Sequence, residues 1–577
     1  MNPRPAQESP DLGPGKDVKG DGAIPADPNS QSDDVGSPTL TEAQLAELAP
    51  FGYERAVEVG DTLFRAGDAA YDFAVVLEGA VEVVRPDDTG DVVIVTHGPG
   101  RFLGELSLVT GERPYLTARV SGAGRILVIE PSAFQRMMSS KPDIADVIFG
   151  ALVARRERLQ SGEGARAVRI IGSRFSPPAM ALRVFAAQNH LVHSWIDLED
   201  AEDVGVLLAS MGLRPVDTPV VVTPSATVRH ATVGQFAELL GLTYQPVPGF
   251  TFDVVVVGTG PAGLASAVYG ASEGLSTVSL DALGSGGQAG ASSRIENYMG
   301  FPNGVSGGEL TGRAAIQAQR LGARLNAPCE VTGLRVERGF HVLVLADGSE
   351  IPTRAVIVAT GARYRRLAVP DLERFEGAGV YYAATDLEAR VCGGLEVFVL
   401  GGGNSAGQAA IYLAQQGSRV SIAIRRDDLS ASMSHYLIER IEADPRVEVL
   451  TGTEVRGLAG DTHLEQVTIE HTATGAVETV PCSGLFCFIG AVPATSWLGD
   501  AVALDDKGFV LTDRSLPESA LSDPSFAGRA PLPFETSVPG VFAVGDVRQG
   551  SLKRVASAVG EGSSAVRSVH DHLATSA

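Results

Sequence analysis

The amino-acid sequence predicts a multidomain α/β protein. Two doubly wound, parallel-sheet units fill its C-terminal half, and a β-rich unit and a small α/β unit precede them. Three observations lead to this prediction. The chain has 577 residues, enough for three or four domains of roughly 150 residues each. It contains 67 glycines and only 6% aromatic residues, which suits tight turns between strands and helices. In two places an apolar strand runs into a glycine-rich turn and then a helical segment.

Charge and cysteine content exclude several classes of protein. The chain carries 46 Lys+Arg against 69 Asp+Glu, a net charge of −23, which argues against a nucleic-acid-binding or anionic-membrane-binding surface. Four cysteines in so long a chain exclude a disulfide-stapled secreted scaffold. Residues 1–40 are rich in Pro, Gly and Asp and lack the apolar segment of a signal peptide. We therefore predict a disordered tail and a cytoplasmic protein.

The remaining N-terminal half divides into two units. Residues 41–160 begin and end with helical segments, and between them half-buried strands alternate with glycine turns. Residues 161–165 read as a linker. Residues 166–243 follow the order strand, helix, strand, helix, strand, which predicts a small α/β domain. A second linker at residues 244–250 leads into a large α/β region, residues 251–577.

The strongest motif opens the large C-terminal region. An apolar strand runs into the sequence Gly-Thr-Gly-Pro-Ala-Gly, from Gly258 to Gly263, and a helix follows. In such a turn the first glycine makes the bend, Gly260 lets a pyrophosphate approach, and the last glycine permits close helix–strand packing. The next strand ends in Asp281, 23 residues after Gly258, near the spacing expected of a ribose-binding acid. This segment predicts a Rossmann-like dinucleotide-binding unit.

A second strand–turn–helix–strand unit begins near Leu395. Its turn contains Gly401 and Gly403, but its second strand ends in Arg425 and Arg426 where the first unit has an acid. Arginine at this place can hold the 2′-phosphate of NADP, whereas an acid binds the free 2′-hydroxyl of NAD. The sequence therefore predicts a second Rossmann-like unit that prefers NADP.

Together these pieces resemble a low-molecular-weight thioredoxin reductase over residues 251–577. The motifs that carry the resemblance are GTGPAG, GGQ (286–288), IENYMGFP (295–302), ATG (359–361), GGGNSA, RRDDL and VFAVGDV (541–547). The resemblance implies an FAD-binding domain split into residues 251–366 and 490–577, with an NADPH-binding domain, residues 367–489, inserted between the halves. It also implies a homodimer.

By matching position, the resemblance implies two sets of cofactor-binding residues. The expected FAD-binding residues are Gly258, Gly260, Pro261, Ala262, Gly263, Asp281, Gly287, Gln288, Asn297, Thr360, Gly361, Gly545 and Asp546. The expected NADPH-binding residues are Gly401, Gly403, Asn404, Ser405, Ala406, Arg425 and Arg426. We thus expect an NADPH-dependent flavoprotein oxidoreductase with FAD and NADPH as cofactors and no metal.

One departure from the family bears on the mechanism. Thioredoxin reductases carry a Cys-x-x-Cys motif before the GGGN strand, and its disulfide takes electrons from the flavin. Here residues 384–387 (Ala-Thr-Asp-Leu) occupy that place. We predict that Cys329, Cys392, Cys482 and Cys487 are buried, inert thiols. Because a lone thiol cannot form an intramolecular disulfide, no side chain is assigned a catalytic role and the flavin itself is expected to pass electrons on.

Several functions stay open on this evidence. The first is an oxidoreductase whose acceptor is a quinone, a ferredoxin-like protein, oxygen or an external disulfide. The second is a nucleotide-gated redox sensor with little turnover. The third is a genuine thioredoxin-disulfide reductase with an unrecognised thiol relay. The sequence identifies neither the acceptor nor an effector.

Residues 41–160 resemble a cyclic-nucleotide-binding β-roll. Gly104 and Glu105 match the turn that holds the ribose and cyclic phosphate in that family, but Leu116 stands where an arginine should grip the phosphate. Arg113 or Arg119 would have to reach from a shifted register. Without the charge-assisted bond that an arginine supplies, we expect weak cyclic nucleotide binding or none.

Residues 166–243 resemble a thioredoxin- or glutaredoxin-like domain. Ser173 and Ser176 occupy the two cysteine positions of its redox motif, and Thr218-Pro219 matches the cis-proline turn opposite that motif. Serine cannot cycle through a disulfide. We therefore expect a docking or spacer domain that keeps the fold without the redox chemistry.

Overall fold

The computed structural model describes residues 35–86, 90–161, 166–200, 204–337, 339–522, 526 and 528–575. The predicted disorder of residues 1–40 falls mainly on residues 1–34, which lie outside the described residues. The predicted boundary differs from the structure, however, because Leu40 is already buried and its N–H donates to the Gly100 carbonyl at 2.8 Å. None of the described helices has the length and apolar character needed to cross a membrane.

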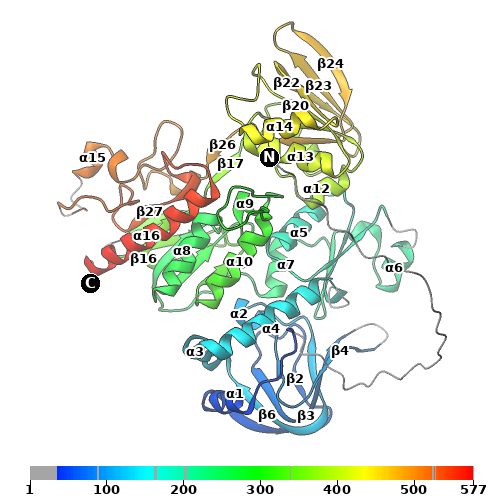
Figure 1. The fold of residues 1–577 in the computed structure, drawn as a ribbon, viewed down its shortest axis with the longest axis vertical. Coiled ribbons are helices and arrows are strands. Elements are labelled where there is room, and N and C mark those ends of the chain that lie inside the picture. The colour runs from blue at the N-terminus through cyan, green and yellow to red at the C-terminus, as the bar shows by residue number, and fades with distance from the viewer. Residues whose placement is uncertain are drawn as a thin grey trace, which may run out of the picture.

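The β-roll domain (residues 35–161) lies at the bottom of Figure 1. Its antiparallel sheet has the order β1-β6-β3-β4, with β2 on β6 and β5 on β3. Consecutive buried side chains of one long strand alternate between two apolar clusters, Ala74 and Val76 in one and Phe73 and Val75 in the other, so both faces of the sheet are covered there. The strands are β1 (Tyr53–Val57), β2 (Thr62–Phe64), β3 (Phe73–Arg85), β4 (Val92–His97), β5 (Phe102–Leu103) and β6 (Thr117–Ile129). The helices are α1 (Glu42–Leu48), α2 (Ser107–Thr110), α3 (Pro131–Ser140) and α4 (Pro142–Ser161).

The thioredoxin-like domain (residues 166–243) has a four-stranded sheet of order β10-β9-β7-β8, in which only β7 and β8 are parallel. The Thr218-Pro219 peptide bond is cis, as predicted. The strands are β7 (Arg169–Gly172), β8 (Ser194–Asp197), β9 (Val220–Val222) and β10 (Thr227–Val228). The helices are α5 (Pro177–Gln188), α6 (Val204–Ser210) and α7 (Val233–Leu240).

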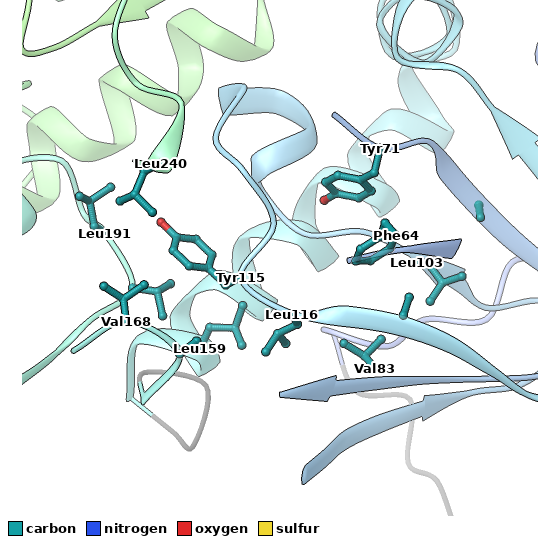
Figure 2. Packing of buried hydrophobic residues seen from close by; sticks show 14 of the residues in the cluster. Phe64, Tyr71, Val83, Leu103, Tyr115, Leu116, Leu159, Val168, Leu191 and Leu240 are labelled. Atoms are coloured by element: carbon teal, nitrogen blue, oxygen red, sulfur yellow. The ribbon is translucent and has the colours of Figure 1, made fainter. Parts of the chain in front are cut away.

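The β-roll and thioredoxin-like domains share one hydrophobic cluster. Figure 2 shows Tyr115 and Leu159 of the β-roll domain reaching toward Val168, Leu191 and Leu240 of the thioredoxin-like domain. Each of these side chains is buried. The two predicted units therefore pack against each other through apolar side chains. Residues 162–165 of the predicted linker lie outside the described residues.

The first Rossmann domain (residues 251–366 and 490–577) is built on a sheet whose parallel part has the order β13-β12-β11-β16-β27. Its central strand, β11 (Phe252–Val257), is almost continuously apolar because both of its faces are buried. Helices cover one face, and the apolar side chains of Cys329, Val331, Leu343 and Leu345 lie on the other. The other strands are β12 (Thr277–Leu280), β13 (Arg324–Asn326), β14 (Val331–Val336), β15 (His341–Leu345), β16 (Glu350–Val358) and β27 (Val541–Ala543). The helices that position the site are α8 (Pro261–Ser272), α9 (Gly287–Gly290), α10 (Gly307–Arg320) and α16 (Val555–Thr575).

The second Rossmann domain (residues 367–489) lies at the top of Figure 1. It contains a parallel sheet of order β18-β25-β19-β20-β21 and a three-stranded antiparallel sheet of β22 (Thr453–Ala459), β23 (Gln466–His471) and β24 (Ala476–Pro481). Its main strands are β18 (Val380–Tyr381), β19 (Glu396–Leu400), β20 (Arg419–Ala423), β21 (Val447–Leu450) and β25 (Gly484–Cys487), and its helices include α12 (Asp386–Val391), α13 (Asn404–Gln415) and α14 (His435–Ala443). The two crossings to the first Rossmann domain, β17 (Ala362–Tyr364) and β26 (Ala491–Pro493), pair with each other. The predicted multidomain α/β fold is confirmed.

Candidate active site

The glycine turn of the first Rossmann domain is closed so tightly that side chains do not fit. Gly258 has a φ of +105°, and a Cβ there would overlap the Ala359 carbonyl. A Cβ at Gly263 would overlap the Gly258 carbonyl oxygen. Gly260 is the N-cap of α8, and Pro261 begins the helix with its φ already helical. The turn therefore presents the N-terminal end of α8, where backbone N–H groups favour a phosphate.

Asp281 holds the segments around this turn together. One carboxylate oxygen accepts from the N–H and hydroxyl of Thr259 at 2.8 and 3.0 Å, and the other accepts from the N–H groups of Leu283 and Gly284 at 3.0 and 3.1 Å. The sequence predicts Asp281 as a ribose ligand. In the structure both of its carboxylate oxygens accept hydrogen bonds from the protein, and the ribose role stays a prediction. Thr259 was not singled out, because its part depends on a hydrogen bond across 22 residues.

A second glycine turn packs directly on the first. The Gly286 N–H donates to the Thr259 carbonyl at 2.8 Å, and a Cβ at Gly287 would lie 3.0 Å from the Gly260 Cα. Gln288 donates from its side-chain amide to the Ala362 carbonyl. The structure thus brings two of the predicted FAD-binding segments into contact at the N-terminal end of α8.

The segment around Gly545 closes the other side of the same site. Gly545 has a φ of +71°, and a Cβ there would lie 3.0 Å from the Cβ of Ala262. Its N–H donates to Glu561 of α16 at 2.8 Å, and that carboxylate also pairs with Arg548 at 2.8 Å. Burial raises the pKa of Asp546, and Lys553 opposes that rise. Sequence reasoning missed Glu561, which lies 16 residues after Gly545.

The remaining predicted FAD-binding residues lie farther from this core. The Thr360 hydroxyl donates to the Ala494 carbonyl at 2.8 Å, and the Gly361 carbonyl accepts from the Ala494 N–H at 3.0 Å. These bonds tie the two crossing segments between the Rossmann domains. Asn297 is exposed on the segment between α9 and α10.

The turn of the second Rossmann domain repeats the first. Gly401 has a φ of +127°, a Cβ there would overlap the Phe488 carbonyl, and Gly403 is the N-cap of α13. Asn404 accepts from the Ser434 N–H at 2.7 Å, so its side chain fastens the turn to the segment before α14. Ala406 lies in the first turn of α13 (Asn404–Gln415) and is buried. Arg425 and Arg426 are exposed just beyond the end of β20, where a ligand can reach them.

Tyr364 contacts the second turn and lies near Asp546 of the first Rossmann domain. It is on β17, its hydroxyl is hydrogen-bonded to Ser405 of the second turn, and burial raises its pKa, with the charge of Asp546 adding to the rise. Its ring meets that of Phe488 edge-on, with centroids 5.3 Å apart. One aromatic side chain thus lies between the predicted FAD-binding and NADPH-binding segments, a position that sequence motifs did not indicate.

Comparison with known families decides what these two turns are. The family model described as "Pyridine nucleotide-disulphide oxidoreductase" matches residues 252–562. The chain belongs to this family. A model described as "Cyclic nucleotide-binding domain" matches residues 54–141. These two findings confirm the resemblances noted for residues 251–577 and for residues 41–160.

Individual relatives agree with this assignment. The chain is 32% identical over 316 residues to the thioredoxin reductase of Chlamydia trachomatis, across 54% of this chain and 94% of that protein. It is also 32% identical over 324 residues to the thioredoxin reductase of Treponema pallidum, across 56% and 98%. Among solved structures it is similar to the Lactococcus lactis thioredoxin reductase in its FR conformation, with 29% identity, a TM-score of 0.51 and coverage of 56% and 100%. It is also similar to the T. acidophilum thioredoxin reductase, with 29% identity, a TM-score of 0.50, and coverage of 56% of this chain and 98% of that chain.

As a member of this family, the protein is an NADPH-dependent flavoprotein oxidoreductase with FAD and NADPH as its cofactors. The geometry fits both. Each Rossmann domain offers a turn that only glycine permits, at the N-terminal end of a helix, and Gly545 lies against α8 where a side chain would crowd the first cradle. Among the described residues, no group of three or more His, Cys, Asp or Glu side chains could hold a metal ion.

The segment matched in the sequence to the family's disulfide motif forms the start of a helix. Thr385 is the N-cap of α12, and its N–H and hydroxyl both donate to Glu388 in a capping box. Ala384 is buried in the core of the second Rossmann domain. Cys392, at the other end of α12, is fully buried. The structure therefore places apolar packing and a helix cap where sulfur chemistry would be needed.

All four cysteines of the sequence are free and buried, as predicted. Burial raises the pKa of each thiol to about 12. Because the thiolate is the reactive form, such thiols react very slowly at neutral pH.

In the β-roll domain, an arginine from α4 occupies the predicted nucleotide turn. Arg156 makes two bonds to Glu105, at 3.0 and 3.1 Å, and reaches Glu112 at 3.1 Å. The Gly104 carbonyl accepts from the neighbouring Arg155 at 2.6 Å. The carboxylate expected to bind a ribose is thus already neutralised from within the chain.

The rest of that turn is filled by apolar and aromatic side chains. Leu116 is buried in the same apolar cluster as Phe64 and Tyr71, all three labelled in Figure 2. The Tyr115 hydroxyl donates to Glu112 at 2.7 Å. Of the two arginines considered as substitutes, Arg113 contacts the end of α7 and Arg119 pairs with Asp91 at 3.1 Å. Weak or absent cyclic nucleotide binding stays a prediction, now supported by this packing.

Proposed function

We propose that this protein passes electrons from NADPH through FAD directly to an external acceptor, without an internal disulfide. The observation that carries the proposal is that its cysteines are buried and form no disulfide. The four cysteines are buried and unpaired, each with a pKa of about 12. The segment at residues 384–387, which matches the family's redox motif in position, contains none of them.

When bound, FAD accepts a hydride from NADPH and delivers electrons to the acceptor. The chain's own residues supply position. The turns that begin at Gly258 and Gly401 present helix N-termini toward the dinucleotide phosphates. Arg425 and Arg426 would select the 2′-phosphate, and Tyr364 is hydrogen-bonded to Ser405 of the second turn. The acceptor is a quinone, a ferredoxin-like protein, oxygen or an external disulfide, and the active form is a homodimer.

A cysteine-free variant tests the proposal. Cys329, Cys392, Cys482 and Cys487 are changed together to Ala, because a serine hydroxyl buried without a partner would be destabilising. FAD content and melting temperature are measured first. We expect NADPH oxidation with ferricyanide or a quinone within about threefold of the native rate, since flavin chemistry alone carries the electrons.

Loss of turnover in a folded, FAD-loaded variant would mean that a thiol relay exists and that the protein is a disulfide reductase after all. A native disulfide found by mass spectrometry would lead to the same conclusion. The same acceptor series, run with and without cyclic AMP, addresses the sensor alternative, which requires slow turnover that rises with the nucleotide.

A further inference from the structure

The thioredoxin-like domain rests on the second Rossmann domain with the face that bears its altered redox motif. Phe175, between Ser173 and Ser176, stacks on His463, with ring centroids 4.7 Å apart and planes 21° from parallel. Just after the motif, Pro177 lies against Gly377, where an added Cβ would be 3.4 Å from the Cβ of Pro177. The face that would present sulfur in a redox-active thioredoxin-fold domain is therefore partly covered, with Ser173, Phe175 and Ser176 half-buried and Pro177 exposed beside the contact.

The covered surface adjoins the segment that replaces the family's disulfide. Arg183 of α5 is close enough to Glu388 for its charge to lower the pKa of that carboxyl, against the larger effect of burial, which raises it. Glu388 completes the capping box of α12 by accepting from Thr385, the N-cap. Two motifs that have both lost their cysteines thus belong to domains that pack together here.

The other end of α5 contacts the first Rossmann domain. The Asn189 amide donates to the Leu283 carbonyl at 3.5 Å and lies against Gly284, in the segment that Asp281 organises. His190 lies against Gly312 of α10. Helix α5 has twelve residues, which gives a length of about 18 Å. In Figure 1 it lies between α10 and α12.

This arrangement restrains the two Rossmann domains. They are joined covalently only by the paired crossing segments β17 and β26, and a two-segment connection of this kind permits hinge motion. A third contact that spans both domains away from the hinge opposes such motion. The contact is anchored, because the thioredoxin-like domain shares its core with the β-roll domain.

We propose that the surface of the second Rossmann domain around Gly377, Glu388 and His463 is a docking surface for a thioredoxin-fold domain, permanently occupied by the chain's own. This internal occupant holds the two Rossmann domains in one orientation and excludes other thioredoxin-fold proteins from that surface. Electrons then leave the flavin by another route. The inference is independent of which acceptor receives them.

A cross-link tests the docking directly. In Pro177→Cys/Gly377→Cys the two Cβ atoms fall near the separation of about 3.5–4.5 Å that a disulfide spans. The native thiols can stay in place, because their pKa of about 12 keeps them unreactive. Oxidation of the full, FAD-loaded chain with diamide removes one hydrogen from each new thiol and reduces the diamide to its hydrazine. The two single variants are the matched controls.

We expect the bond to form in the folded protein without denaturant. The rates of flavin reduction by NADPH and of ferricyanide reduction should stay within twofold of the same variant with its thiols reduced. A folded chain in which the bond does not form would overturn the docking. A cross-linked chain that loses more than tenfold in rate, and recovers when the bond is reduced, would show that the domain must lift away during turnover.

Gly377 has a φ of +79°, so a cysteine there strains the backbone. If that variant does not fold, Phe175→Cys/His463→Cys bridged by a short bis-maleimide gives the same readout, with the same outcomes. Bond formation is scored by mass spectrometry and needs no activity. A failure of the proposed electron route therefore remains distinguishable from a failure of the docking.

Discussion

Removing the guanidinium of Arg156 should destabilise the N-terminal half of the protein severely. In Arg156→Met the carboxylates of Glu105 and Glu112 keep their buried positions, with side-chain exposures of 12% and 5%, but lose their cation. Breaking a buried ion pair by deleting one partner costs about 3–5 kcal/mol. The β-roll and thioredoxin-like domains share a core, so they should melt together. For a body of roughly 200 residues, about 2–4 °C per kcal/mol gives a fall in melting temperature of roughly 6–20 °C.

Calorimetry on the FAD-loaded full chain measures this fall, and flavin fluorescence separates the melting of the Rossmann domains. The triple variant Arg156→Met/Glu105→Gln/Glu112→Gln should recover at least half of the loss, because no buried charge remains. Arg125 is the matched control, since it also pairs with two carboxylates, of Glu54 and Glu78, but at the surface, where water screens the pairs. If Arg156→Met shifts the melting temperature no more than Arg125→Met, the buried network does not hold this domain closed.

Two further predictions concern cofactor choice and pH. Arg425→Ala/Arg426→Ala should raise the KM for NADPH roughly ten- to a hundredfold, from a charge-assisted contact worth about 1.5–3 kcal/mol. The KM for NADH should change little, and Arg419→Ala on β20 is the control; equal effects on the two cofactors would refute the assignment. Burial, with the charges of Arg155 and Arg101, lowers the pKa of His97 from 6.5 to about 3. Because the folded pKa is the lower one, the stability from His97 is present above pH 6.5 and is lost below it at about 1.4 kcal/mol per pH unit. His97→Gln should therefore flatten the pH dependence of urea unfolding between about pH 6.5 and about pH 5, and an unchanged slope would contradict this.

The parts of the site that the sequence predicted are those with local causes. The close approach at Gly263 involves Gly258, five residues earlier, so motif spacing alone indicates it, whereas Gly258 packs on Ala359, which is far away in the sequence. The hydrogen bonds of Asp281 to Leu283 and Gly284 are also local, but the motif assigns the acid to a ribose and says nothing of the backbone around it.

Contacts between residues that are far apart in the chain could not be predicted from the sequence. Leu116 revealed that the expected phosphate arginine was missing, but not that Arg156, 51 residues after Glu105, fills the turn from α4. The serines at Ser173 and Ser176 indicated a domain without redox chemistry. That its altered face rests beside α12 depends on contacts such as Phe175 with His463, which only folding creates.

Helix α10 lies at a junction of a different character from the shared core. Its outer face meets the β-roll domain through Ile316 and through two polar residues, Gln319 on the Thr110 carbonyl and Arg320 on Asp146. Polar, modest interfaces of this sort are typical of domains that fold independently. A catalytic fragment that begins near residue 250 would expose Ile316 to solvent but little other apolar surface of this helix. At this interface the N-terminal half therefore resembles a separate domain attached to a catalytic region that can fold by itself.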